Sequence, residues 1–435
     1  MADLTSLLST GAASARVDIT FVAEGYLASD RATFLADAAR FLDYMFNPAN
    51  TALNAPFSSY HEYFNANALF VASNESRWNV TAGLADTYFK ANSYHADGRL
   101  VYGDSGKVEQ TVAAALASDA RDLTIVLVNS QAYGGAGGPV SWATTGNVAS
   151  AEILLHELGH TVAGLGDEYI DPVLGAAPLD RPLRLPNVTS VSDAPPWQAW
   201  LGYEDGLGKI GLYEGGYYRA KGVWRATQDS KMLTLGTAFN APEKEALALG
   251  FYRLTGDYLS FDKRIPGLCL AVVPDRDTLS YAWSQDGVAI ANGAGYCADL
   301  YGSGKYAPGA MFTLTTTDAT GLIRSGLELT RQTETLTVQD AVMELAGGTV
   351  EIAEGGKVFR LDGGGNAVAI RDTVSGAYVD GGNGADTVIL AMAQSDGTLE
   401  QLESGTWLLS RGTAPLLALR NVEFVRFSDA TRALV

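Results

Sequence analysis

The sequence predicts a mixed α/β or α+β domain followed by all-β domains, because its composition and periodicity change near residue 258. Before this point, "DLTIVLVN" (122–129) is a continuous apolar run of strand length, typical of a strand buried on both faces. After it, helical periodicity fades, and short alternating segments separated by Gly, Asp and Asn turns take over. Since 435 residues exceed one compact core, we predict several domains. Their predicted bounds are 1–258, 259–330 and 331–435.

The first domain begins with "VDITFVAEGY" (17–26), which predicts a strand and a turn. A helix should follow, with Ser29 or Asp30 as its N-cap. The glycine-rich segment "GGAGGPVSWATTG" predicts a turn and then an extended piece around residues 140–142. A last helix is expected at "APEKEALALGFYRL" (241–254).

The charge of the chain excludes some classes of partner. With 49 acidic and 30 basic residues, the formal charge is −19, and the pI is about 4.6. Such a surface repels phosphate backbones and anionic membranes, so we expect neither nucleic acid nor membrane partners. The N-terminus lacks the basic and apolar regions of a secretory signal, and no apolar run reaches the length of a membrane span. This predicts a cytoplasmic protein or export by a route that leaves the N-terminus unmarked.

The stretch "LLHELGHTVAGLGDEY" (154–169) carries the most specific chemical pattern. Successive residues of a helix are rotated by about 100° around its axis, so His156, Glu157 and His160 lie on one face. The two histidines can present ring nitrogens to one ion, and Glu157 is placed to hold a metal-bound water. Ser150 is the expected N-cap of this helix. Because two of the four histidines in the chain occur here, we prefer a metal site to a coincidental motif on an ordinary helix.

A third protein ligand is expected in the turn after the helix. Many enzymes with this motif place a histidine at position 166, where this chain has glycine. Gly164 and Gly166 permit a sharp reversal, and the glycine-x-x-ligand spacing is kept with Asp167. Zinc accepts carboxylate oxygen, so a fourth position would remain for water, and Glu168 should not touch the metal. The predicted ligands are His156, His160 and Asp167.

The segment "HELGHTVAGLGDEY" resembles the signature of the bacterial IgA-peptidase-type zinc metallopeptidases, in which an HExxH helix runs into a Gly-x-Asp-Glu-Tyr turn. The resemblance covers roughly residues 15–255 and includes "DITFVAEGY", "LVNSQAYGGAGG" and "YEGGYYRAKGVWRATQDSKM". It implies a zincin-like (metzincin-like) fold, endopeptidase activity, and a methionine turn formed by Met232 beneath the metal. It does not imply IgA as the substrate, since members of one family need not share a target.

The chemistry expected of this site needs few groups. Zinc lowers the pKa of its water to about 7, and Glu157 would take the proton and later deliver it to the leaving amine. Tyr217 or Tyr218 could donate a hydrogen bond to the tetrahedral oxyanion, ordinary packing being the alternative. The extended piece at 140–142 could offer a strand edge to which the substrate adds.

The segment "GGNGADTVI" (381–389) fits the glycine-rich nonapeptide of RTX proteins at every fixed position. In such repeats the aspartate and the turn carbonyls share calcium, so Asp386 is a candidate Ca²⁺ ligand. Only one degenerate neighbour, "LDGGGNAVA", accompanies it, whereas a stable coil needs about three repeats. This shortage weighs against a calcium-filled β-roll, and the glycines can equally be plain turns.

Three further features concern the C-terminal part. The closing segment 419–435 resembles the tail that follows RTX repeats in substrates of one-step bacterial export, which predicts secretion without an N-terminal signal. Residues 259–330 resemble an immunoglobulin- or PKD-like sandwich, with two strands in "LSYAWSQDGVAIANG" (279–293). Cys269 and Cys297 are either two free thiols or a disulfide, and the sequence does not decide between them.

We therefore predict a secreted, monomeric zinc endopeptidase that acts on proteins or peptides. One alternative is a binding or adhesion protein whose peptidase-like domain is inactive. The intact Glu157 counts against it, because degenerate sites usually lose the base first. Another alternative, a serralysin-type enzyme, would require histidine at position 166.

Overall fold

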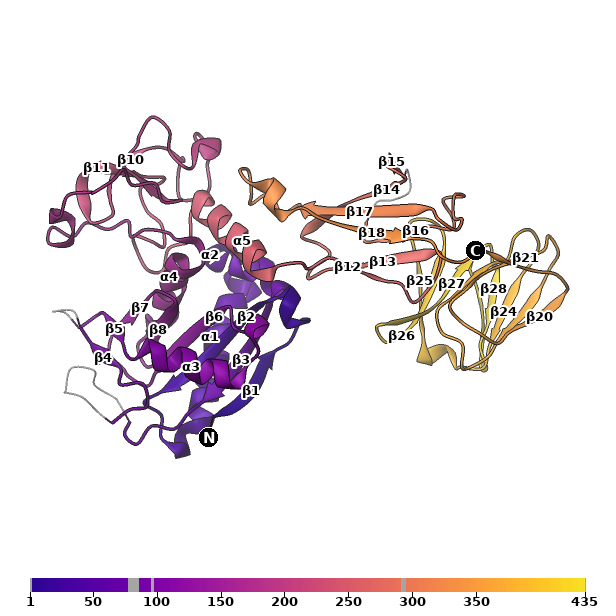
Figure 1. The fold of residues 1–435 in the computed structure, drawn as a ribbon, viewed down its shortest axis with the longest axis horizontal. Coiled ribbons are helices and arrows are strands. Elements are labelled where there is room, and N and C mark those ends of the chain that lie inside the picture. Colours follow the sequence, from indigo (N-terminus) through magenta and orange to yellow (C-terminus); the bar gives the residue numbers. More distant parts are fainter. Residues whose placement is uncertain (1, 77–85, 95–97, 291–294, 435) are drawn as a thin grey trace. The chain divides into compact units, whose positions relative to one another are not determined.

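The computed structural model describes residues 2–76, 86–94, 98–290 and 295–434. The chain forms two compact units, each described here by itself (Figure 1). The N-terminal unit comprises Met1–Tyr258 and Thr320–Thr330, and the C-terminal unit comprises Leu259–Ala319 and Arg331–Val435. Residues 320–330, which the sequence placed in a second domain, are therefore part of the first unit. A mixed α/β part followed by a strand-rich part confirms the coarse fold prediction.

A six-stranded sheet in the order β1-β3-β2-β6-β8-β7 forms the centre of the N-terminal unit. The four inner strands run parallel, and the two edge strands pair antiparallel with their neighbours. Central strand β6 is buried on both faces, as its apolar run predicts. The strands are β1 Asp3–Leu8, β2 Val17–Glu24, β3 Phe64–Phe70, β6 Leu123–Val128, β7 Gly135–Ala136 and β8 Val140–Thr144.

Helices cover this sheet. Val108 and Val112 of helix α3 belong to the same buried cluster as Val126 and Val128 of β6. Alternation along β6 turns its other apolar side chains to the opposite face. Helix α1 contacts β3 and β6, and α4 contacts β7, β8 and α5. The helices are α1 Arg31–Phe46, α2 Thr51–Asn54, α3 Ser105–Ala115, α4 Ser150–Ala163 and α5 Ala241–Thr255. Shorter strands are β4 Asn92–Ser93, β5 Val101–Tyr102, β9 Val188–Thr189, β10 Tyr213–Gly216 and β11 Arg219–Arg225.

The two predicted N-caps fare differently. Asp30 is the residue before α1, as expected. Ser150 is the first residue of α4 and not its cap, because Ala149 holds that position. The side chain of Asn147 accepts from the Ala149 N–H at 2.9 Å and so organises the entry to the helix. The Ser150 hydroxyl is buried without a hydrogen-bond partner among the described residues.

The excursion 320–330 completes the N-terminal unit through contacts with α5 and nearby loops. The backbone N–H of Ser325 donates to Glu245 Oε1 at 2.6 Å. The guanidinium of Arg324 lies 4.0 Å from the centre of the Trp200 ring. A fragment that ends at residue 258 would lack this segment and its contacts.

The C-terminal unit begins with two small antiparallel sheets, ordered β12-β13-β16 and β15-β14-β17-β18. Their shared core contains Trp283, Phe312 and Leu314. Cys269 and Cys297 lie on the paired strands β13 and β16 and are free thiols, which decides the alternative that the sequence left open. The strands are β12 Ser260–Asp262, β13 Leu268–Val272, β14 Leu279–Gln285, β15 Val288–Ala289, β16 Cys297–Asp299, β17 Met311–Asp318 and β18 Gln332–Thr337.

The rest of this unit is a roll of two sheets, because strands β19 to β24 alternate between the sheets and pair in parallel, as do β23 with β27 and β24 with β28. Strands β25, β26 and β29 extend the two sheets by antiparallel pairing. One sheet has the order β19-β21-β23-β27-β26-β25, and the other β20-β22-β24-β28-β29. The roll thus forms although only one complete glycine repeat and one degenerate neighbour are present, and calcium within it stays a prediction. Inward apolar residues such as Val368, Val388 and Leu419 supply the core even where the glycine motif is degenerate.

The strands of the roll are β19 Met343–Leu345, β20 Thr349–Ile352, β21 Val358–Leu361, β22 Ala367–Ile370, β23 Ala377–Asp380, β24 Thr387–Leu390, β25 Thr398–Gln401, β26 Trp407–Arg411, β27 Ala414–Arg420, β28 Phe424–Arg426 and β29 Thr431–Ala433. The predicted export tail forms the last of them. Val422, Val425 and Leu434 are buried in the core of the roll, so this tail is part of the folded unit.

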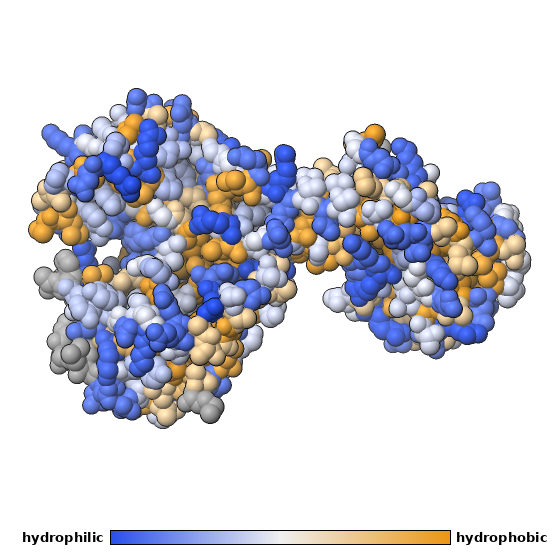
Figure 2. Space-filling model, in the orientation of Figure 1, coloured by the Kyte–Doolittle hydropathy of each residue, from blue (hydrophilic) through white to orange (hydrophobic). Residues whose placement is uncertain are grey.

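Among the described residues, no helix combines the length and apolar character needed to cross a membrane. On the face drawn in Figure 2, hydrophilic and hydrophobic residues are interspersed. His61 packs against Phe46, and His95 lies outside the described residues.

Candidate active site

Helix α4 places His156, Glu157 and His160 on one face, and all three side chains line one cleft. The helix ends at Gly164, which adopts the left-handed conformation with φ of 62°. The backbone N–H of Leu165 then donates to the carbonyl of Gly159 at 3.1 Å, which closes the end of the helix. This reversal returns the chain towards the two histidines.

Asp167 lies where the turn passes the helix. Its Oδ1 atom is 3.0 Å from His156 Nε2 and 3.4 Å from His160 Nε2. Candidate ligand atoms of these three residues all lie within 4.8 Å of one another. Burial raises the pKa of Asp167, but hydrogen bonds from both histidines outweigh it and hold this pKa below its ordinary value.

Backbone carbonyls orient both histidine rings. His156 Nδ1 lies 3.1 Å from the carbonyl oxygen of Lys231, and His160 Nδ1 lies 2.7 Å from that of Leu165. A carbonyl only accepts, so each Nδ1 carries the proton. Each Nε2 atom faces Asp167 Oδ1, and loss of the Nε2 proton would make its lone pair available to a metal ion, so this donor set fits a zinc-type centre.

Glu157 lies in the same cleft but is not one of the three clustered groups. Its carboxylate accepts a hydrogen bond from the backbone of Gly137, which follows β7. Burial raises the pKa of Glu157, and the nearby histidines oppose that shift. The edge of the sheet next to Glu157 is β7, with β8 inside it. Strand β7 pairs with Trp142 and Ala143, so it covers Trp142 but not Val140 or Ser141 of the expected edge at 140–142.

Three tyrosines surround Asp167. The hydroxyl of Tyr218 donates to Asp167 Oδ2, and Tyr169 lies in a ring contact with Tyr218 at 5.3 Å between centroids. Burial and the charge of Asp167 raise the pKa of Tyr169 to about 12 and that of Tyr218 further. Tyr217 and Tyr218 both have positive φ, of 48° and 68°. Tyr218 lines the cleft, whereas the Tyr217 ring packs beside Gly166.

Met232 is fully buried beneath the helix, where its sulfur would meet a β-carbon added at Gly159 at 2.9 Å. The segment before it is anchored by an ion pair between the buried Lys231 and Glu152 at the start of α4. Burial lowers the pKa of Lys231, and the carboxylate of Glu152 opposes that shift. The same segment supplies the carbonyl that orients His156.

Glu168 points away from the clustered groups and is fully buried. Its direct partners are the hydroxyl of Ser230 at 2.9 Å and the amide of Asn187 at 3.1 Å. The Ser230 oxygen also lies 2.9 Å from Glu243 Oε1. Burial and mutual repulsion raise the pKa of Glu168, and burial raises that of Glu243 to about 7.

The cleft has a volume of about 510 Å³. Besides the polar groups it exposes a set of apolar side chains, and Arg99 lies over the Tyr169 ring at 5.4 Å. The apolar side chains are Leu100, Tyr133, Ile153, Leu174, Leu233 and Leu235. Sequence reasoning missed Arg99, Tyr169, Asn187, Ser230 and Glu243. Only Tyr169 had a local signal, since it ends the Gly-x-Asp-Glu-Tyr turn.

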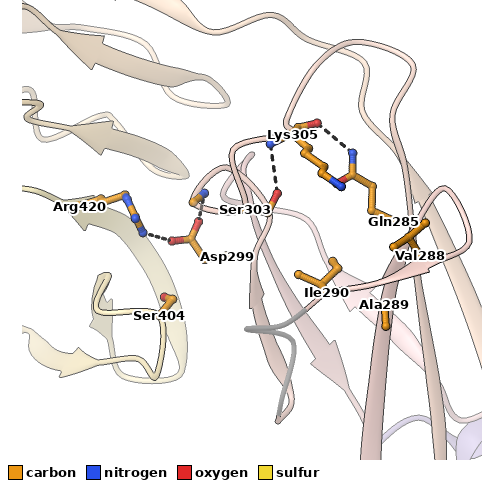
Figure 3. Close-up of a pocket in the computed structure, with 10 residues that line it drawn as sticks. Gln285, Val288, Ala289, Ile290, Asp299, Ser303, Lys305, Ser404 and Arg420 are labelled. Carbon is orange, nitrogen blue, oxygen red and sulfur yellow. Dashed lines mark hydrogen bonds and ion pairs between the residues drawn. The ribbon is translucent and has the colours of Figure 1, made fainter.

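A further cavity of about 290 Å³ lies in the C-terminal unit (Figure 3). Its most polar group, Asp299, accepts hydrogen bonds from the backbone of Gly302 at 2.7 Å and from Arg420 at 3.0 Å. The hydroxyl of Tyr378 also donates to Asp299, at 2.9 Å. These bonds hold the strands of the unit together, so we assign no chemistry to this cavity.

Asp386 follows the glycine turn between β23 and β24 and is fully buried. Its Oδ1 atom accepts from the backbone of Asn366 at 2.8 Å, whereas Oδ2 has no hydrogen-bond partner among the described residues. Burial raises the pKa of Asp386, and the charges of Glu423 and Asp362 raise it further. A buried carboxylate oxygen without a partner is costly, which makes this the strongest candidate cation site in the roll.

The helix and the returning turn define a metallopeptidase-type site: two histidines, one aspartate and a glutamate meet in one cleft. The comparison with family models agrees. Residues 5–207 match the model described as IgA Peptidase M64, so this region carries an IgA-peptidase-type metallopeptidase domain, and the resemblance read from the motif is confirmed. The match ends before Tyr217, Tyr218 and Met232. No curated protein matches the chain.

Proposed function

We propose that the chain is a zinc-dependent endopeptidase with a zincin-like catalytic domain. The observation that carries the proposal is the convergence of His156 Nε2 and His160 Nε2 on Asp167 Oδ1, with Glu157 in the same cleft. Two imidazoles and one carboxylate form a ligand set that leaves a further position open, as catalytic zinc sites require. When bound, a zinc ion lowers the pKa of water to about 7 and polarises the scissile carbonyl.

Glu157 acts as the general base in this proposal. Its carboxylate is held by the backbone of Gly137, and burial raises its pKa towards the range in which it can both take and return a proton. It takes a proton from the attacking water and delivers it to the leaving amine. Because β7 is the sheet edge beside Glu157, a substrate strand added there would bring its carbonyl next to the carboxylate.

Tyr218 is the better of the two predicted oxyanion donors. Its hydroxyl already lies in the cleft, on Asp167, whereas the Tyr217 ring packs beside Gly166. The raised pKa of Tyr218 keeps its hydroxyl protonated, so it can donate to developing negative charge.

The test is hydrolysis of a generic unfolded protein by the wild type and by Glu157→Ala. General-base catalysis is worth about 10²–10⁴-fold, so the variant should lose at least about 100-fold in rate. It should keep zinc near one ion per chain, because Glu157 is not a ligand. Glu109→Ala, which removes an exposed glutamate on α3, is the matched control. Activity of Glu157→Ala above about a tenth of the wild type would rule out the proposed role.

The two alternative functions have less support. An inactive binding protein would not need a half-buried glutamate beside two histidines whose rings are oriented by backbone carbonyls. A serralysin-type site needs a side chain at position 166, where an added β-carbon would meet Val188 at 2.6 Å and Leu185 at 2.8 Å. The packing around Gly166 therefore opposes a histidine ligand there.

We further propose that the roll binds calcium at Asp386, on the evidence of its buried and unpartnered Oδ2 atom. A parallel roll with glycine turns also supports secretion of the chain, which we propose. If so, cells that contain a one-step exporter should release the full chain into the medium, and cells that lack it should retain it. Deleting residues 421–435 is a poor test, because Val425 and Leu434 belong to the core of the roll.

A further inference from the structure

Asn187 is a fully buried residue that immediately precedes β9 and reaches the turn that carries Asp167. Its Oδ1 atom accepts from the backbone N–H of Gly166 at 2.8 Å, and its Nδ2 donates to the carbonyl of the same glycine at 2.8 Å. The amide thus satisfies both backbone polar groups of the residue directly before Asp167. Glycine has the most flexible backbone of all residues, so these two hydrogen bonds restrict a position that would otherwise be mobile.

The residue after Asp167 is held as firmly. The backbone N–H of Glu168 donates to the carbonyl of Met232 at 2.9 Å. The carboxylate of Glu168 accepts from Asn187 Nδ2 at 3.1 Å and from Ser230 Oγ at 2.9 Å. The same asparagine therefore bonds to the residues on both sides of Asp167.

Glu243 anchors this arrangement to α5. Its Oε1 atom lies 2.9 Å from Ser230 Oγ and 3.4 Å from Asn187 Nδ2. Its Oε2 atom accepts from the backbone of Asn240 at 2.8 Å and so closes the capping box of the helix. A rigid helix end thus supports the two side chains that hold the turn.

We propose that Asn187 and Glu243 are positioning residues, which hold the backbone on both sides of Asp167 so that its carboxylate meets His156 and His160 without reorganisation on metal binding. The inference rests on the proposed metal site. None of the bonds described above involves the Asp167 side chain. Loss of the bonds made by Asn187 and Glu243 therefore leaves all three ligands present but lowers their affinity for the metal. Groups that orient metal ligands are typically worth about 10–100-fold in metal affinity.

The experiment compares Asn187→Ala with Asn65→Ala in the full chain. Asn65 is also buried, on β3, and its amide bonds to the backbone of Thr10 at 2.9 Å and of Gly11 at 3.1 Å, away from the cleft. Both variants lose a bonded amide, so both should lower the unfolding temperature of the metal-free protein. Zinc affinity, measured by competition with a chromogenic chelator, should fall about tenfold or more in Asn187→Ala and stay within about twofold in Asn65→Ala.

A second pair protects the test if Asn187→Ala fails to fold. Ser230→Ala removes the hydroxyl that contacts both Glu168 and Glu243 and that accepts from the backbone N–H of Met232 at 3.2 Å. Ser73→Ala is its control, since the Ser73 hydroxyl accepts backbone bonds at 2.9 Å and 3.1 Å and lies away from the ligands. Zinc affinity should fall about threefold or more in Ser230→Ala alone.

The outcomes separate this inference from the proposed function. Unchanged zinc affinity in Asn187→Ala and Ser230→Ala, with the wild type binding zinc, would overturn the positioning role and leave the metal site intact. Equal losses in the control variants would also overturn it, because affinity would then follow general stability. A wild-type chain that binds no zinc would overturn the metal site itself.

Discussion

In two turns of this molecule an aspartate follows glycine residues, and the two carboxylates differ in their hydrogen-bond partners. In the N-terminal unit, Asp167 Oδ1 faces both histidines, and Oδ2 accepts from Tyr218. In the C-terminal unit, Asp386 Oδ1 accepts a backbone bond, and Oδ2 is buried with no partner among the described residues. Among the described residues, polar groups contact both oxygens of the Asp167 carboxylate, whereas they contact only one oxygen of the Asp386 carboxylate.

The difference also explains what the sequence could predict. His156, Glu157, His160 and Asp167 lie within one helix and its turn, so helical periodicity and the helix-ending glycine indicate their convergence. Asn187 and Glu243 support that turn. They belong to segments that are distant from the motif in sequence, so no local sequence pattern predicts their role. The strength of a site that is local in sequence thus depends on residues that are not.

The roll shows the same limit at the level of the fold. In one of its sheets Thr349 pairs with Ala367, and Ala367 pairs with Thr387, so 18 and then 20 residues separate the paired positions. This uneven spacing hides the repeat from a search for a fixed motif. Parallel pairing between such segments leaves only alternating apolar residues as a signal, and those fit a sandwich as well as a roll.

The largest effect should come from the completed turn. Asp167→Ala removes one of three protein ligands and should weaken zinc binding by more than about 100-fold. Glu168→Gln keeps the shape of a buried side chain that points away from the metal ligands. This variant should therefore lose less than about tenfold in zinc affinity. Competition with a chelator measures both. Tight zinc in Asp167→Ala and weak zinc in Glu168→Gln would show that the two neighbours have been assigned the wrong way round.

A smaller effect is expected at the incomplete turn. Calcium at about tenfold above a dissociation constant of about 10⁻³ M should stabilise the C-terminal unit by about 1.4 kcal/mol. Thermal unfolding of the wild type should therefore shift upwards with calcium and not with the same concentration of magnesium. Asp386→Asn should remove the shift. If calcium leaves the wild-type transition unchanged, the unpartnered oxygen is only an unfavourable feature of the roll. Asp386 would then not be a calcium ligand.

The last effect concerns Asp18 on β2, and it tests whether an unpartnered buried oxygen by itself indicates an ion. Its Oδ2 atom is also buried without a hydrogen-bond partner among the described residues, yet no glycine turn surrounds it. Burial raises the pKa of Asp18 to about 6, and the charge of Asp122 adds to the shift. The folded state therefore favours the protonated form, and stability is lost as the pH rises from about 3.8 to about 6.

Asp18→Asn removes this charge and keeps an oxygen that can accept from Asn65, as Asp18 Oδ1 does at 3.2 Å. The free energy of unfolding should rise by about 1–3 kcal/mol at pH 8, and the gain should disappear below about pH 4. Denaturant unfolding at both pH values measures it. A gain that is equal at both would mean that the charge of Asp18 is not the cause. A response of Asp18 to calcium would mean that any buried carboxylate in this chain can recruit an ion, so the glycine turn around Asp386 would no longer distinguish its site.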